Sequence, residues 1–259
     1  MNFLALLMLC VVFHLSFCEI LNCRFKDHTF YRVNFYTCFV TSFDITINNV
    51  VITGHNGVHE PNKNDTDVKA IYIQETDTKY IPENLGRLFN LTVLWIGSTQ
   101  IFEVNDKRFQ GMINLEQLFL NSNKLTSIPL NTLIDLMKLK IISLSSNRIE
   151  DLPNGIFKNN LNLEQIKLFN NKIKFLGSTL FDGLTKLYHV DLEGNVCINK
   201  WYKDITEMVQ LKKDIKTQCF YSNENPPTTT TQEPKEIQQI LLNQQNVHEK
   251  ELDKLCLMV

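Results

Sequence analysis

Four side chains able to bind a metal ion or move a proton share one short stretch of the sequence: His55, His59, Glu60 and Asp65. Imidazole nitrogens and carboxylate oxygens are common zinc ligands. The surrounding stretch, Gly54 to Asp67, is polar and loop-like, and nothing in it fixes a ligand geometry. We therefore expect a solvated loop here, with no bound metal and no cofactor.

Thiols are the second reactive class, and the chain holds seven cysteines. Two of them, Cys10 and Cys18, lie in an apolar N-terminal stretch. Five cysteines remain, and we expect two disulfides among them, one between Cys23 and Cys38 and one between Cys197 and Cys219. Cys256 is then left without a partner in this chain. An unpaired thiol in a secreted chain is usually bonded to another chain or to a small thiol. For Cys256 we expect an interchain disulfide, the alternative being a free or capped thiol in the tail.

The N-terminal stretch is typical of a secretion signal, because residues 2–18 are apolar apart from Asn2, His14 and Ser16. We expect residues 1–18 to be removed and the chain to be extracellular. No later run approaches the roughly 20 apolar residues of a membrane span. The last four residues also form a prenylation box, but a secreted chain does not meet the cytosolic transferase.

Charge and motifs exclude several functions. The 26 basic and 28 acidic residues nearly balance, so we expect no nucleic-acid partner. The sequence has no G-x-S-x-G, H-E-x-x-H or phosphate-binding loop, and no catalytic residues are suggested by spacing. We expect a non-enzymatic protein.

A period of 24 residues organises the middle of the chain. The spacing L-x-x-L-x-L-x-x-N-x-[LI]-x-x-[LIV] recurs from leucines that begin each unit: Leu91, Leu115, Leu139, Leu163 and Leu187. Its polar position is held by Thr99 in the first unit and by asparagine in the others: Asn123, Asn147, Asn171 and Asn195. Alternating apolar positions, such as Leu118 and Leu120, predict a short strand with one buried face.

This spacing resembles the leucine-rich repeat. The resemblance implies an α/β solenoid whose short parallel strands form a concave face, with each Asn amide satisfying turn backbone groups. A second apolar layer should close the convex side: Phe109, Leu133, Phe157 and Phe181. Residues 68–73 fit a degenerate first repeat, which gives about six repeats over residues 68–195.

Caps and a tail are expected outside the repeats. Residues 19–67 should form an N-terminal cap. Residues 196–222 resemble the cysteine-bearing C-terminal cap of extracellular leucine-rich repeat proteins, with two cysteines instead of the usual four, and Tyr202 to Leu211 have helical spacing. Residues 223–234 are a Pro/Thr linker, and residues 235–259 predict an amphipathic helix that needs a second chain to pack against.

The binding surface is predicted from the strand positions that point away from the core. Tyr72, Trp95 and Phe119 fall on adjacent strands and should form an aromatic stripe. The same face should also present the remaining candidates: Val93, Ile141, Lys167, Phe169, His189 and Asp191. Exposed aromatic groups of this kind are typical of protein interfaces, so we expect a protein ligand. Alternatively, another part of the protein covers the stripe, or the rings only stack on one another and bind no ligand.

Two sequons, at Asn64 and Asn90, are expected to be N-glycosylated, unless Asn90 lies too close to the core. The whole layout is similar to secreted leucine-rich repeat proteins of arthropod innate immunity. That resemblance implies recognition of a protein or glycoconjugate and pairing through C-terminal coiled coils and a disulfide. A structural role in extracellular matrix or adhesion is the alternative, and an enzyme or enzyme inhibitor is a third possibility.

Overall fold

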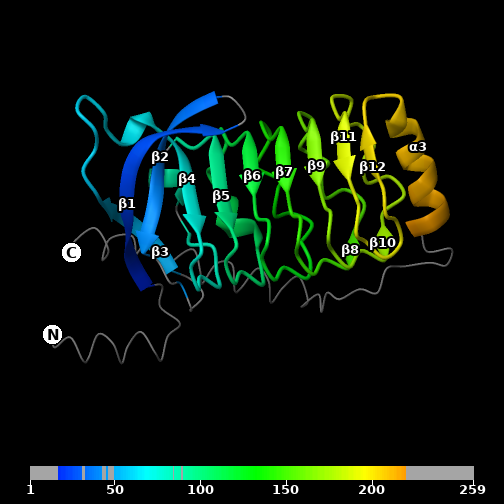
Figure 1. The fold of residues 1–259 in the computed structure, drawn as a ribbon, viewed down its shortest axis with the longest axis horizontal. Helices are drawn as coiled ribbons and strands as arrows, with labels where there is room; N and C mark the ends of the chain where they lie inside the picture. Colours follow the sequence, from blue (N-terminus) through cyan, green and yellow to red (C-terminus); the bar gives the residue numbers. More distant parts are fainter. Residues whose placement is uncertain are drawn as a thin grey trace, which may run out of the picture. The chain divides into compact units, whose positions relative to one another are not determined.

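The structure is a computed structural model that describes residues 17–30, 33–42, 45, 50–83, 85–88 and 90–219. Within these residues one sheet has ten strands in the order β12-β11-β9-β7-β6-β5-β4-β2-β1-β3. Its centre is a row of six parallel strands, one for each expected repeat (Figure 1). They are β4 (Val68–Gln74), β5 (Val93–Gly97), β6 (Gln117–Phe119), β7 (Ile141–Ser143), β9 (Gln165–Lys167) and β11 (His189–Asp191). The predicted solenoid of parallel strands is confirmed.

Several predictions concern segments outside the described residues. These are the signal segment up to residue 16, the linker 223–234, the amphipathic helix 235–259 and Cys256. They stay predictions. Among the described residues, no helix is both long and apolar enough to cross a membrane.

The N-terminal cap is built from three strands. β1 (Phe17–Phe30) and β2 (Val33–Ser42) form an antiparallel hairpin that the expected Cys23–Cys38 disulfide joins. β2 then pairs in parallel with β4, so the hairpin continues the sheet beyond the first repeat. β3 (Val50–Asn56) extends into the stretch that the sequence predicts as loop. The cap thereby occupies the edge that the first repeat would otherwise leave unpaired.

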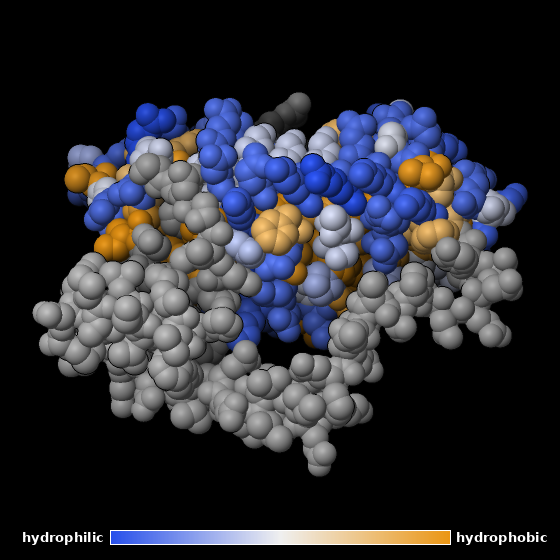
Figure 2. All heavy atoms as spheres, turned by 90° about the horizontal axis from the view of Figure 1, so that it is seen from below, coloured by the Kyte–Doolittle hydropathy of each residue, from blue (hydrophilic) through white to orange (hydrophobic). Residues whose placement is uncertain are grey.

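The core lies between the sheet and the connections behind it. The connections contain η1 (Asp65–Asp67), α2 (Leu85–Leu88), η2 (Asp106–Phe109) and a two-stranded sheet of β8 (Asp151–Leu152) and β10 (Phe175–Leu176). The second apolar layer is confirmed, since all four of its residues are buried: Phe109, Leu133, Phe157 and Phe181. The side of the molecule that faces down in Figure 1 is mainly hydrophilic where it is coloured, with separate hydrophobic patches (Figure 2).

The asparagines form the predicted hydrogen-bonded ladder. Asn147 donates through Nδ2 to the carbonyl of Leu144 in its own repeat at 2.9 Å and to that of Leu120 in the preceding repeat at 2.9 Å. Its Oδ1 accepts the backbone N–H of Leu125 at 3.0 Å. The same three bonds recur at Asn171 and Asn195, and in the first unit Thr99 donates to Asn123 at 2.5 Å. Each side chain therefore links two neighbouring repeats.

A left-handed residue precedes every position of this ladder. The φ angles lie between 53° and 67° at Glu75, Ser98, Ser122, Ser146, Asn170 and Gly194. This conformation turns the chain sharply after each strand, which points the next side chain toward the core. Most L-residues adopt it only at an energetic cost, so the buried hydrogen bonds of the ladder hold it in place.

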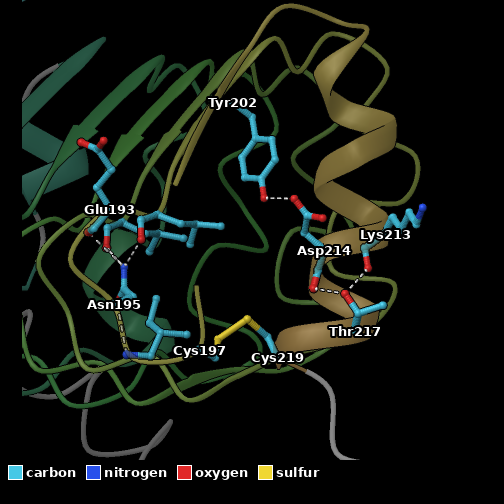
Figure 3. The surroundings of a disulfide bond; sticks show 11 residues. Glu193, Asn195, Cys197, Tyr202, Lys213, Asp214, Thr217 and Cys219 are labelled. Atoms are coloured by element: carbon cyan, nitrogen blue, oxygen red, sulfur yellow. Dashed lines mark hydrogen bonds between the residues drawn. A yellow bond between two sulfur atoms is a disulfide. The ribbon is translucent and has the colours of Figure 1, made fainter. Parts of the chain in front are cut away.

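The C-terminal cap comprises β12 (Trp201–Lys203), α3 (Glu207–Asp214) and η3 (Ile215–Cys219). The expected Cys197–Cys219 disulfide closes it, and Tyr202 Oη donates to Asp214 Oδ2 at 2.6 Å (Figure 3). The helical assignment of Tyr202 is wrong, because Tyr202 pairs with Val190 as part of a strand antiparallel to β11. The helix begins only at Glu207 and covers the last repeat.

Candidate functional site

The predicted binding residues lie on the outward face, defined here as the side of the sheet opposite the leucine core. The strand register places Tyr72 beside Trp95, and Trp95 beside Phe119. The same column then continues through Ser143, Lys167, Asp191 and Trp201. The predicted alignment is therefore found, and β12 adds Trp201 at the C-terminal end.

The aromatic stripe is longer than the sequence indicates. Trp95 stacks on Phe119 with ring centroids 4.5 Å apart and on Tyr72 at 5.3 Å. Tyr72 meets Phe39 of β2 at 5.3 Å, and Phe39 meets His28 of β1 at 5.2 Å. Five rings from five adjacent strands therefore form one continuous contact, which we call the ring ladder. Sequence reasoning missed Phe39 and His28, because the hairpin that holds them lies outside the repeat period.

Three of the predicted binding residues are buried, although the sequence predicts that they are exposed. Val93, Phe119 and Ile141 are 0%, 2% and 7% exposed, and with Ala70 they form a buried apolar cluster on the outward face. Tyr72 and Trp95 pack against this cluster and are half-buried. Stacked rings and β-branched neighbours shield one another on a sheet surface. Tyr72 and Trp95 therefore present more surface than Phe119 does.

Two features position the half-buried rings. A Cβ built on Gly97 would lie 2.7 Å from Trp95 Nε1, so the missing side chain at residue 97 makes room for the indole. Tyr72 donates its hydroxyl hydrogen to Gln74 Oε1. Burial, with a smaller contribution from Glu75, raises the pKa of Tyr72, so the phenol stays protonated.

The C-terminal half of the outward face is polar. Lys167, His189 and Asp191 are half-buried on β9 and β11, as is Phe169 just after β9. The His189 ring lies 6.5 Å from that of Trp201, whose ring also receives the Lys203 ammonium at 5.9 Å. Burial, together with the charges of Lys167 and Lys203, lowers the pKa of His189 despite the opposing effect of Asp191. The sheet face thus changes from aromatic to charged along the solenoid.

Both sequon asparagines are exposed. Asn64 caps η1, where its Oδ1 accepts from the Thr66 N–H at 2.8 Å and from the Thr66 hydroxyl at 2.7 Å. Asn90 accepts a hydrogen bond from Asn114 at 2.7 Å just before β5. Burial therefore does not prevent modification at either position, and glycosylation stays a prediction.

The structure also brings together three of the four possible metal ligands. His55 Nε2 and His59 Nε2 lie 2.6 and 2.9 Å from the same oxygen, Asp65 Oδ1. Burial raises the pKa of Asp65, but the hydrogen bonds from His59 and His55 outweigh that effect and lower it overall. The side chain of Glu60 is not in the cluster. The expectation that nothing fixes a geometry in this loop is wrong.

The family comparison agrees with the repeat pattern. The family model described as "Leucine rich repeat" matches residues 89–149 and 137–196. These matches cover the repeats from β5 to β11, and the fold is that of a leucine-rich-repeat solenoid. No curated protein sequence is significantly similar to this chain.

Solved structures are similar over part of the chain. One is the "Octameric complex of Latrophilin 3 (Lec, Olf), Unc5D (Ig, Ig2, TSP1) and FLRT2 (LRR)", with 23% identity and a TM-score of 0.45 over 50% of this chain and 39% of that chain. A second is the "Toll - Spatzle complex, a molecular hub in Drosophila development and innate immunity", with 23% identity and a TM-score of 0.48 over 49% and 18% of the two chains. A third is the "TLR13-ssRNA13 complex", with 25% identity and a TM-score of 0.48 over 50% and 18%. This chain thus spans well under half the length of each of these three chains.

Proposed function

We propose that this chain is a secreted, non-catalytic recognition protein that binds a protein ligand through the concave, outward face of its repeats. The observation that carries the proposal is the ring ladder. Four half-buried rings on four adjacent strands, those of His28, Phe39, Tyr72 and Trp95, offer a ligand a continuous aromatic surface beside the buried Phe119. Aromatic side chains are the commonest anchors of protein interfaces. A polar, charged half adjoins that surface, so a ligand could be oriented as well as held.

A rigid scaffold favours this role. The strands that carry the rings are paired in register, and the Trp95 indole is stacked on Tyr72 and on Phe119. Because these groups are already ordered, a ligand that contacts them costs the protein little conformational entropy. Association therefore depends mainly on how well the ligand surface fits the rings.

The double substitution Tyr72→Ser and Trp95→Ser is expected to abolish ligand capture while the fold persists. Each anchor contributes about 2 kcal/mol or more at an interface, which corresponds to about 30-fold in affinity. The measurement is quantitative mass spectrometry of proteins captured from the native fluid by the immobilised chain and by the variant. Thermal unfolding of both proteins shows whether the fold is intact.

Phe102→Ser is the matched control, because Phe102 is an exposed aromatic residue off the outward face that contacts Tyr80. This control should retain every captured protein. Phe119→Ser is unsuitable as a test of binding, since loss of a buried phenylalanine should itself cost about 3 kcal/mol of stability. A double variant that folds and captures the same proteins as the original chain would remove the ring ladder from the function.

We also propose that a second chain joins through the C-terminal helix and Cys256. On non-reducing electrophoresis the secreted protein should migrate as a larger species, and Cys256→Ser should convert it to the monomer. The four cap cysteines form the two intrachain disulfides, which leaves them unavailable for this bond. A single monomeric band for the original chain would contradict the interchain disulfide.

An immune setting is the preferred context within this proposal, and it rests on the layout of signal, capped repeats, linker and cysteine-bearing tail. Expression decides between this setting and a structural role. A recognition protein of immunity should be induced on challenge and stay soluble in body fluid. A matrix or adhesion component should instead be deposited in insoluble material.

A further inference from the structure

We propose that His55, His59 and Asp65 form a zinc site in the N-terminal cap. The three potential ligand atoms all lie within 4.8 Å of one another. The residues come from two segments, because His55 is in β3 whereas Asp65 begins η1. A bound ion would therefore tie the end of β3 to the turn that leads into the first repeat strand, β4.

The distances are close to those a zinc ion needs. With bonds of about 2.0–2.1 Å in a tetrahedral arrangement, neighbouring ligand atoms lie about 3.3 Å apart. The two Nε2 atoms are now 2.6 and 2.9 Å from Asp65 Oδ1. The carboxylate must therefore withdraw by less than about 1 Å to admit the ion. Its side chain is 53% exposed, which leaves it room to move.

The imidazoles are held more firmly than the carboxylate. Their side chains are only 14% and 18% exposed. The Phe25 ring stacks on His59 with centroids 4.1 Å apart and meets the edge of His55 at 4.9 Å. One buried aromatic side chain from β1 thus orients both rings, and their Nε2 atoms converge on Asp65.

Tyr36 supplies the outer partner that a zinc-bound imidazole requires. Its Oη lies 3.3 Å from His59 Nδ1 and also accepts the backbone N–H of Glu60 at 2.8 Å. When Nε2 binds a metal, Nδ1 carries the proton and must donate it, and the second lone pair of Tyr36 Oη can accept it. Tyr36 therefore acts as a positioning residue for His59.

The donor set favours Zn²⁺ over the hard cations. Two imidazole nitrogens and one carboxylate oxygen suit Zn²⁺, whereas Ca²⁺ and Mg²⁺ prefer ligand sets made only of oxygen. Three protein ligands leave the fourth tetrahedral position for a water molecule. Because the ion would bind the folded cap and not the unfolded chain, it should raise the unfolding temperature.

The test is zinc titration of the secreted full chain after dialysis against a chelator. We expect one Zn²⁺ per chain by competition with a chromophoric chelator, and an unfolding temperature that rises with zinc. His59→Gln and Asp65→Asn should each weaken binding by more than about 100-fold, beyond the loss usual for an outer partner. Tyr36→Phe should weaken it by about tenfold.

His189→Gln is the matched control, because it removes a half-buried imidazole from β11 and should leave zinc affinity unchanged. The proposal would be overturned if the original chain failed to bind zinc. It would also be overturned if the His59 and Asp65 variants bound zinc as tightly as the original chain does. If those variants do not fold, X-ray absorption of the zinc-bound original chain still decides. Its spectrum must show two imidazole ligands, and any other number rejects the site.

Discussion

Replacing Asn147 by alanine is expected to lower the free energy of unfolding by about 3 kcal/mol, because the substitution removes its buried hydrogen bonds to Leu120, Leu144 and Leu125. The carbonyls of Leu120 and Leu144 each keep a second partner, Asn123 and Asn171 respectively. The N–H of Leu125 loses the side-chain acceptor that Asn147 supplies and stays buried inside the solenoid. That orphaned donor should account for most of the cost. Thermal unfolding should show a decrease of about 6–12 °C in Tm.

Asn195→Ala is the graded control for this experiment. Asn195 makes the same three bonds, but it is half-buried at the end of the ladder, where water can replace a lost partner. We expect about half the loss found for Asn147. A loss at Asn147 below about 0.5 kcal/mol would mean that the ladder is not what joins the repeats. Equal losses at the two positions would mean that burial does not set the cost of a lost ladder bond.

The repeats could be predicted because their physical cause leaves a period in the sequence. Each buried Leu and each ladder Asn must return at the same place in the next turn, so the register of Tyr72, Trp95 and Phe119 follows from spacing alone. The left-handed residue before each ladder position leaves a weaker signal, because serine holds it only at Ser98, Ser122 and Ser146. Glu75, Ser98 and Gly194 all adopt it, and the surrounding hydrogen bonds, not the residue type, impose it.

The candidate sites were predictable only where they follow that period. Phe39 and His28 extend the ring ladder through an antiparallel hairpin, whose register depends on the turn and has no counterpart elsewhere in the chain. The convergence of His55 and His59 on Asp65 was missed for the same reason. It depends on Phe25 of β1, which is distant in sequence and meets the imidazole of His55 only once β1 and β3 are neighbours in the sheet.

The burial of Phe119 shows a further limit of sequence reasoning. Strand alternation predicts correctly that Phe119 points away from the leucine core. It does not predict that Trp95, Val93 and Ile141 pack around Phe119 to make a second buried cluster on that face. Side-chain size and stacking, which act between neighbouring strands, decide this exposure.

Removing the Cys197–Cys219 disulfide by a double alanine substitution is expected to lower the free energy of opening the C-terminal cap by about 3 kcal/mol. The two cysteines are 22 residues apart, and opening a loop of this length gives the unfolded cap additional chain entropy. That entropy corresponds to a free energy of about 3 kcal/mol. Other contacts also hold the segment. They include the Tyr202–Asp214 hydrogen bond and the burial of Leu211 on α3. Burial opposes the low pKa of Asp214, but hydrogen bonds from Tyr202 and Gln210 lower it overall, so the carboxylate is ionised at neutral pH.

Hydrogen exchange at neutral pH measures this loosening directly. Amides of α3 should exchange about 100-fold faster in the Cys197→Ala, Cys219→Ala variant, whereas amides of β5 and β6 should change much less. The matched control is Cys23→Ala with Cys38→Ala, which opens the other disulfide in the β1–β2 hairpin and should leave α3 unaffected. If α3 keeps its protection without Cys197 and Cys219, then packing against the last repeat, and not the covalent bond, closes this end of the solenoid.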